Sequence, residues 1–380
     1  MQILPVSQLK EGMIIAEPIM TKRGQVISKT GSVLTAQLIA RLSFYKIEEV
    51  SVEDPAPVEE APAALAPAPV EEAPAAPVPP KEKVSEQISY SQRLKASPKF
   101  KQFQMDYAFN TEYLRENFEA IIAGAGSEVS DMILEHFEVL YRQKTSLELL
   151  DMLHNMRGSE DTVFAHSINV SLIARAIGKW CKMDADELNT LTTAGLLHDI
   201  GKLLVPDEIL NKQGKLTDEE FKTIQSHTLL GNKTLKNKGF DQRIPLAALQ
   251  HHERSDGSGY PRGLASDEIE PFAAIIAIAD VYDAMTAYRS YRKPLCAFQV
   301  ISEFEKDGLQ KYETQYILTF LEHMAAAYQN SRVLLSDMRS GRVVYINQQA
   351  LSRPVVGLDS GEIVDLSASA NSGLYIQAII

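Results

Sequence analysis

A tract rich in proline, alanine, glutamate and valine prevents the chain from folding as a single domain. Residues 55–80 consist almost entirely of these four residue types, and the nonapeptide Ala-Pro-Val-Glu-Glu-Ala-Pro-Ala-Ala occurs at 56–64 and again at 68–76. This composition offers too few large apolar side chains for a core, and frequent proline favours extended polyproline II structure. We therefore predict a semi-rigid linker over 55–86 that spans at most roughly 80 Å, at about 3.1 Å per residue.

The rest of the chain has the composition of a soluble globular protein. Its 380 residues suffice for two or three domains, with 45% apolar and 23% charged residues. No apolar run approaches the roughly 20 residues that cross a bilayer, and the first residues lack the basic and apolar regions of a signal peptide. We expect a cytoplasmic protein without membrane insertion. Cys181 and Cys296 follow no metal or redox spacing and are interpreted as packing residues.

The net charge of −12 disfavours binding to the phosphate backbone of DNA or RNA. A small anionic ligand can still be held by metal ions and a few local cations. The charge thus argues against a nucleic-acid partner without defining a substrate.

The apolar pattern predicts a small β-rich domain before the linker. Over 1–54 the apolar residues form short runs broken by turn signals, with one helix-like stretch from Thr35 to Phe44. We interpret this module as a packing or dimerisation unit, with a signalling partner as the alternative.

After the linker the pattern becomes helical, and it returns to short strands near the end. We predict a helical connector over 87–144, an all-helical domain over 145–330 and a small β domain over 331–380, so the fold class is mainly α. Thr217 and Glu220 form a capping-box pattern. Helices are expected near 161–180, 185–198, 217–235, 244–253, 271–286 and 296–329.

Histidines and carboxylates concentrate in the helical domain. The pair His198-Asp199 ends an apolar helix just before Gly201, and an imidazole beside a carboxylate can hold one metal ion while the second carboxylate oxygen holds another. Asp280 follows an apolar helical run, where a buried carboxylate is costly unless it is paired or bound to metal. Chemistry alone therefore indicates a dinuclear phosphohydrolase. Three other histidines of the chain, His136, His154 and His323, are interpreted as hydrogen-bonded core residues and not as ligands.

Two motifs stand out in the predicted helical domain: His-Asp-Ile-Gly-Lys at 198–202 and His-His-Glu-Arg-Ser-Asp-Gly-Ser-Gly-Tyr-Pro at 251–261. Together they resemble the HD-GYP family of bacterial cyclic di-GMP phosphodiesterases. The resemblance implies an HD-domain helical bundle that binds two divalent ions, with iron or manganese favoured and zinc as the alternative. It assigns one ion to His166, His198, Asp199 and Asp280, and the other to Asp199, His227, His251 and His252.

Some family members bind a third metal through a Glu four residues before the first histidine. This position is Thr162 here, and Asp161 is one place off. We therefore expect two metal ions.

The resemblance also suggests residues that bind substrate. It implies that Lys202 contacts a nonbridging phosphate oxygen of the substrate. The position of Lys202 alone also suits a cation that stabilises a helix C-terminus. Gly259, Tyr260 and Pro261 would border a nucleotide pocket or merely form a turn. Arg289 and Arg292 stand where the family has cations that contact phosphate or guanine, although Ser290 replaces the proline common between them.

The expected activity is hydrolysis of cyclic di-GMP to linear pGpG, or on to GMP, by a metal-activated hydroxide with Asp199 and Lys202 as catalytic residues. A homodimer is the expected assembly. One alternative is a catalytically silent sensor of cyclic di-GMP, and another is an HD hydrolase of a different cyclic dinucleotide.

Overall fold

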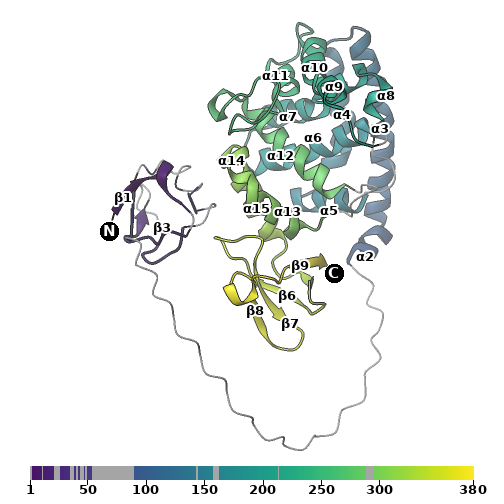
Figure 1. The fold of residues 1–380 in the computed structure, drawn as a ribbon. Helices are drawn as coiled ribbons and strands as arrows, with labels where there is room; N and C mark the ends of the chain where they lie inside the picture. Colours follow the sequence, from purple (N-terminus) through teal and green to yellow (C-terminus); the bar gives the residue numbers. More distant parts are fainter. Residues whose placement is uncertain are drawn as a thin grey trace, which may run out of the picture.

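The computed structural model confirms a mainly α fold with small sheets at both ends (Figure 1). The predicted linker 55–86, together with Asp161, Arg289 and Arg292, lies outside the described residues. No helix in the described part of the chain is both long and apolar enough to span a bilayer. The described residues are 2–10, 12–20, 26–34, 38–39, 42, 47, 49–53, 90–142, 144–156, 162–212, 214–287 and 295–380.

The N-terminal module contains two small antiparallel sheets. Strand β1 (Gln2–Pro5) pairs with β4 (Glu49–Val52), and β2 (Ile19–Met20) pairs with β3 (Val26–Ser28). A short 3-10 turn, η1 (Val6–Gln8), follows β1. Its buried side chains form a core of their own, consisting of Leu9, Ile15, Ile19, Leu34, Leu38, Leu42, Val50 and Val52.

Three helices form the predicted connector: α2 (Tyr90–Ala96), α3 (Pro98–Ala123) and α4 (Glu128–Tyr141). Ser97 caps α3 by accepting the backbone N–H of Phe100 at 3.2 Å. Phe118 and Ile121 of α3 are fully buried, whereas Met132 is 54% exposed and does not belong to the buried face of α4. The buried residues of these helices continue into the core of the helical domain.

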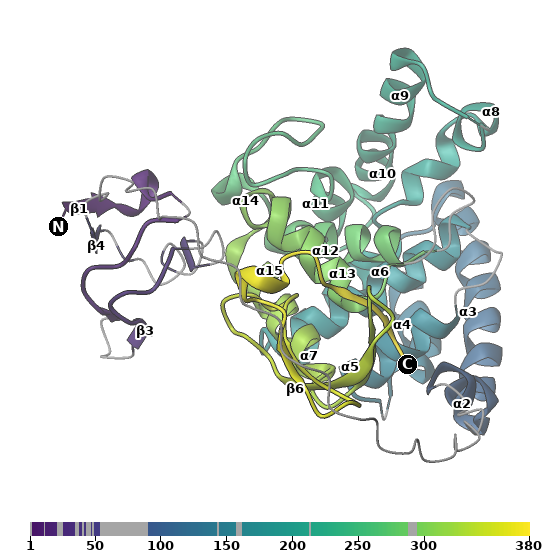
Figure 2. The ribbon, with the colours of Figure 1, turned by 60° about the horizontal axis from the view of Figure 1, so that its bottom comes forward.

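The helices of the central domain gather around α6 and α12 (Figure 2). A side chain at Gly195 would lie 2.7 Å from the Cα of Ser171, so glycine allows α6 and α7 to cross closely. The helices and short turns are α5 (Ser146–Met156), α6 (Val163–Trp180), α7 (Ala185–Leu197), η2 (Ile200–Leu204), α8 (Asp207–Leu210), α9 (Asp218–Gln225), α10 (His227–Leu235), α11 (Arg243–Gln250), η3 (Ser266–Glu268), α12 (Pro271–Thr286), α13 (Ala297–Glu303), η4 (Phe304–Gly308), α14 (Leu309–Lys311) and α15 (Thr314–Ala327).

Two predicted helices are interrupted. The stretch 217–235 forms α9 and α10, which meet at Ser226, and the capping box at Thr217 and Glu220 is confirmed at the start of α9. The stretch 296–329 contains a π-helical turn, η4, and an extended residue, Tyr312, so the prediction of a single long helix was wrong there.

His136 and His323 are exposed rather than in the core, and the ring of each histidine bonds to a backbone carbonyl one turn earlier.

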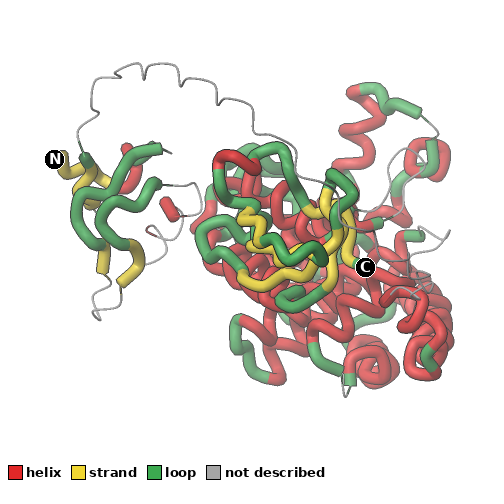
Figure 3. The backbone as a smooth tube through the Cα atoms, turned by 90° about the horizontal axis from the view of Figure 1, so that it is seen from below, coloured by secondary structure: helices red, strands yellow, loops and turns green. Residues whose placement is uncertain are grey.

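The chain ends in a five-stranded antiparallel sheet in the order β8-β7-β6-β5-β9 (Figure 3). Its buried side chains, such as Val333 and Val356, continue the helical core instead of forming a separate one. The domain boundary near 330 stays a prediction. The elements are β5 (Arg332–Leu335), β6 (Ser340–Tyr345), β7 (Val355–Leu358), β8 (Ile363–Asp365), η5 (Ser369–Asn371) and β9 (Ile376–Ile379).

Candidate metal centre

The His198-Asp199 pair lies where α7 ends and η2 begins, and both side chains are fully buried. A side chain at Gly201 would come within 2.0 Å of the His227 carbonyl oxygen and 2.5 Å of the Gly231 nitrogen. Only glycine therefore permits η2 to approach α10 this closely. This contact brings His227 to Asp199.

The two carboxylate oxygens of Asp199 face different imidazoles. Oδ2 lies 3.5 Å from His166 Nε2 and 3.3 Å from His198 Nε2. Oδ1 lies 3.3 Å from His227 Nε2 and 3.6 Å from His251 Nε2. Asp199 thus has the placement of a carboxylate that bridges two cations.

Asp280 joins the same cluster from α12. Its Oδ1 lies 3.2 Å from His166 Nε2, and its Oδ2 lies 3.8 Å from His252 Nδ1. The structure therefore brings together every residue that the sequence suggests as a ligand, from α6, the end of α7, α10, the end of α11 and α12. Two compact groups within it have the spacing of metal sites: His166, His198 and Asp199, and Asp199, His227, His251 and His252.

Backbone carbonyls orient three of the imidazoles. The Nδ1 atoms of His198 and His227 each lie 2.7 Å from a carbonyl oxygen, of Gly195 and Ile224. His251 Nδ1 lies 3.1 Å from the Ala247 oxygen. Because a carbonyl only accepts, each Nδ1 carries the proton and each Nε2 presents its lone pair toward Asp199.

A carboxylate that the sequence analysis missed orients His166. Asp283 is 3% exposed, and its Oδ2 accepts a hydrogen bond from His166 Nδ1 at 2.8 Å. It stands three residues after Asp280 on α12, so both side chains lie on one face of that helix. This spacing is a signal that could have identified Asp283 from the sequence.

Two buried polar atoms of this cluster have no hydrogen-bond partner among the described residues: His198 Nε2 and Asp199 Oδ1. Leaving such atoms unsatisfied costs about 1–3 kcal/mol each. A divalent cation accepts both lone pairs, and imidazole with carboxylate is a donor set that suits first-row metals. The residues present therefore fit a metal centre.

The electrostatics of the cluster also suit a cation. Burial lowers the pKa of His251 to about 4 and the pKa of His252 well below its usual range, so both rings are neutral near pH 7, as metal binding requires. Burial also lowers the pKa of His166, but Asp280 and Asp283 outweigh it and raise that pKa to about 10. A cation that binds His166 must therefore displace a proton.

Lys202 lies in η2, where its ammonium forms an ion pair with Asp199 Oδ2. Burial alone would raise the pKa of Asp199, but Lys202 and His198 hold it well below its usual range. The side chain of Lys202 is 22% exposed, so the ammonium borders the cluster and solvent at once. This position is compatible with a contact to a bound phosphate.

The loop 254–265, named here the Gly-Tyr-Pro loop, is closed by Glu253. This carboxylate is 2% exposed and accepts the N–H groups of Arg262 at 2.8 Å and Leu264 at 3.0 Å. A side chain at Gly259 would lie 2.4 Å from the Glu253 Cα, so the loop needs glycine there. Glu253 had no assigned role in the sequence analysis.

Tyr260 lies against the metal cluster. Its ring stacks on His252 with centroids 4.6 Å apart and planes 26° apart, and its N–H donates to the His252 carbonyl at 3.2 Å. Pro261 follows it through a cis peptide bond. The loop thus brings an aromatic face beside the His/Asp cluster.

Thr162 has a structural role. Its hydroxyl accepts the N–H of Ala165 at 3.1 Å and caps α6. The prediction of two metals stands untested, as do the roles of Arg289 and Arg292, which lie outside the described residues.

The helical fold and the His/Asp cluster define a metal-dependent phosphohydrolase of the HD class. The family model described as "HD domain" matches residues 129–315. Cyclic di-GMP phosphodiesterase PA4108 of Pseudomonas aeruginosa is 30% identical, with 93% of this chain and 84% of that protein covered. The chain belongs to the HD-GYP family of cyclic di-GMP phosphodiesterases.

Two further relatives match over less than half of this chain. A cyclic di-GMP phosphodiesterase of Thermotoga maritima is 38% identical over 46% of this chain and 48% of that protein. The 3'3'-cGAMP-specific phosphodiesterase 1 of Vibrio cholerae is 40% identical over 37% of this chain and 32% of that protein. The chain therefore spans half or less of these two proteins.

Proposed function

We propose that the chain hydrolyses cyclic di-GMP to linear pGpG at a centre of two divalent cations. The observation that carries this proposal is the placement of the Asp199 carboxylate, whose two oxygens face separate pairs of imidazoles. The family relationship and the near full-length similarity to PA4108 support the substrate.

The residues divide between two ions. The Oδ2 side of Asp199 would hold one ion together with His166, His198 and Asp280, and the Oδ1 side would hold the other together with His227, His251 and His252. A bound pair of such ions activates water and neutralises charge on a phosphodiester. We propose iron or manganese for this mixed donor set, with zinc as the alternative.

The chain's own side chains position the substrate. Lys202 offers a cation at the edge of the cluster for a nonbridging phosphate oxygen. Tyr260 offers an aromatic ring, held by the stack with His252, against which a base can pack. Glu253 keeps the Gly-Tyr-Pro loop closed, so Gly259, Tyr260 and Pro261 stay beside the ligands. Arg289 and Arg292 remain candidate contacts to phosphate or guanine.

A second substrate is favoured by one observation. Because the chain is similar to a 3'3'-cGAMP-specific phosphodiesterase, 3'3'-cGAMP is the main alternative substrate to cyclic di-GMP. Hydrolysis of pGpG on to GMP, a homodimer, a cytoplasmic location and a signalling partner at residues 1–54 stay predictions.

The test is a product assay with purified full-length protein. The protein is reconstituted with iron or manganese without oxygen and offered cyclic di-GMP, 3'3'-cGAMP and cyclic di-AMP in parallel. We expect linear pGpG from cyclic di-GMP at the highest kcat/KM. Faster turnover of 3'3'-cGAMP would change the substrate, and hydrolysis of none of them would favour the silent sensor.

A further inference from the structure

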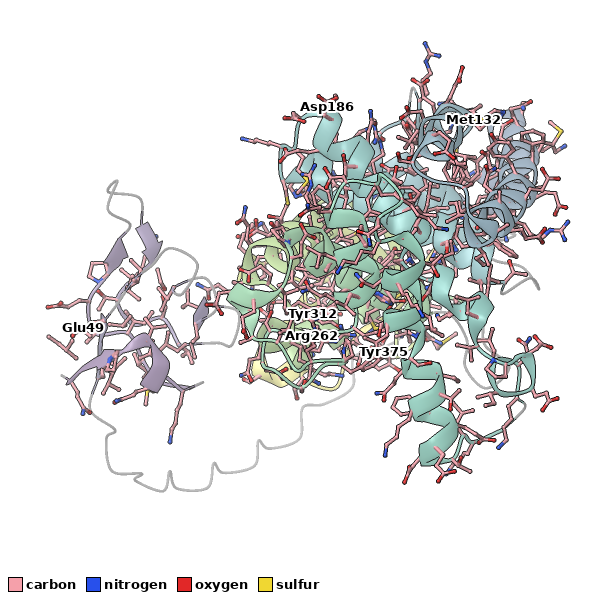
Figure 4. The ribbon with its side chains drawn as sticks, turned by 90° about the horizontal axis from the view of Figure 1, so that it is seen from above. Glu49, Met132, Asp186, Arg262, Tyr312 and Tyr375 are labelled. Carbon is pink, nitrogen blue, oxygen red and sulfur yellow. The ribbon has the colours of Figure 1, made fainter. Side chains whose placement is uncertain are left out.

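The Gly-Tyr-Pro loop is held from outside the metal centre by residues 309–313. The N–H of Ser255 donates to the Lys311 carbonyl at 2.8 Å, and the guanidinium of Arg254 lies 5.2 Å from the ring centroid of Tyr312. Just after the loop, the hydroxyl of Ser266 bonds to the Glu313 carboxylate. In Figure 4, the labels Arg262 and Tyr312 mark these two segments. Residues 311–313 therefore contact the start of the loop and the residue just after its end.

The π-helical turn η4 fixes that segment in turn. The N–H of Tyr312 donates to the Gly308 carbonyl at 3.1 Å, and the rings of Phe304 and Tyr312 pack edge to face with centroids 5.5 Å apart. A side chain at Gly308 would come within 2.9 Å of the Phe304 ring. Turns of this kind are rare and recur at functional sites. Here the turn ends α13 and sets the direction of α14.

Glu305, within this turn, bonds to the C-terminal sheet. Its Oε1 accepts the N–H of Leu351 at 2.7 Å, and its Oε2 accepts the hydroxyl and the N–H of Ser352. Leu351 and Ser352 lie between β6 and β7, and both are buried. A single carboxylate thus connects the sheet to the turn that carries the loop's support.

We propose that Glu305 is a positioning residue through which the C-terminal sheet holds the Gly-Tyr-Pro loop beside the metal centre. The C-terminal sheet bonds to Glu305, the π-helical turn contacts Tyr312, and residues 311–313 contact the loop and its end. The sheet thereby supports the active site without contributing a metal ligand. The kinetic part of the test rests on the proposed function, whereas the exchange part does not.

The test compares Glu305→Ala with Glu303→Ala in the full chain. Glu303 is a matched control because it lies two residues earlier, its side chain is 50% exposed, and its carboxylate forms an ion pair with Lys306. Amide hydrogen exchange is followed by mass spectrometry over 254–265 and, for comparison, over the metal-ligand segment 196–204. Hydrogen bonds to a charged group justify an expected increase of about tenfold in loop exchange for Glu305→Ala, with unchanged exchange at 196–204.

Kinetics and metal content provide a second readout. Glu305→Ala should bind metal like the parent protein and raise KM for cyclic di-GMP about tenfold, with kcat changed by less than about threefold, because the loop is displaced while the ligands stay in place. Glu303→Ala should match the parent in every measurement. Glu305→Gln, which keeps one acceptor oxygen, should fall between the two.

Three results would overturn the proposal. One is unchanged exchange over 254–265 in Glu305→Ala, and another is equal acceleration in every segment, which would make Glu305 a general stabilising residue. If Glu305→Ala does not fold, Ser352→Ala removes a single bond, and a lack of local acceleration there counts against the proposal as well. If the parent hydrolyses no cyclic dinucleotide, the proposed function fails, and the exchange data still decide the role of Glu305.

Discussion

At the scale of single residues, Asp199 and Lys202 are neighbours with different tasks. The carboxylate of Asp199 faces imidazoles on both sides, whereas the Lys202 ammonium contacts that carboxylate and also borders solvent. A substitution at Asp199 should therefore reduce metal binding, whereas a substitution at Lys202 should reduce only the rate of hydrolysis.

The first prediction concerns this difference. Asp199→Asn keeps the size of the side chain but removes its charge, so it should lose bound metal and reduce kcat by at least about 10²–10³, which is about 3–4 kcal/mol. Lys202→Ala should keep the parent's metal content and slow hydrolysis. Elemental analysis and steady-state kinetics measure both. A metal loss in Lys202→Ala equal to that in Asp199→Asn would contradict the separate roles.

The second prediction concerns Asp283, which accepts the proton of His166 Nδ1. Asp283→Asn removes the charge that orients this ring, so metal affinity should fall by about 10–100-fold. Competition with a chelator measures the affinity. Asp186→Asn, at an exposed position in the first turn of α7, is the control and should bind metal like the parent. Parent-like affinity in Asp283→Asn would remove Asp283 from the site.

At the scale of elements, the sequence predicted the helices that carry the ligands and missed what interrupts them. The apolar run of α12 and its proline start define 271–286, and this range is confirmed. The break at Ser226 and the π turn at Phe304–Gly308 depend on contacts between distant segments, which periodicity does not encode. The motifs suggested the ligands but assigned no role to Glu253, whose partners Arg262 and Leu264 lie within the next loop, or to Asp283, which only its spacing from Asp280 could have identified.

The third prediction concerns the start of α12. Glu270 caps this helix by accepting the N–H groups of Phe272 and Ala273, and burial raises its pKa to about 7. The folded state therefore holds a proton that the unfolded chain releases near its ordinary pKa of 4.5. Its contribution to stability is present below pH 4.5 and is lost as the pH rises through about 7.

Urea unfolding at pH 5 and pH 8 checks the sign. Because Glu270 is only partly buried, we expect the parent to lose about 1 kcal/mol relative to Glu270→Gln between these pH values. A parent that gains stability relative to Glu270→Gln over the same interval would show that the capping hydrogen bonds outweigh burial.

At the scale of the whole molecule, the N-terminal module has its own core, whereas the connector, the helical domain and the C-terminal sheet share one. The composition of 55–86 predicts a linker between the N-terminal module and the connector, and this division stays a prediction. The shared core of the sheet was not predictable, because short alternating strands do not reveal what their buried face packs against.

The fourth prediction follows from this division. Deleting residues 1–86 should leave kcat/KM for cyclic di-GMP within about threefold of the full chain, since none of the proposed ligands is removed. Deletion of 331–380 should instead prevent normal folding, because it removes buried side chains such as Val333 and Leu351, which belong to the same core as the helices. A shortened 87–380 protein that binds metal normally but does not hydrolyse substrate would place the N-terminal module in the catalytic machinery.

The most direct test of the central claim is hydrolysis of cyclic di-GMP measured against metal bound per chain in the same samples. Metal-free full-length protein is titrated with iron or manganese, and each point is analysed for bound metal and for pGpG. We predict activity that rises to a maximum at about two ions per chain. Full activity at one ion, a maximum near three, or no pGpG at any loading would contradict a dinuclear cyclic di-GMP phosphodiesterase centred on Asp199.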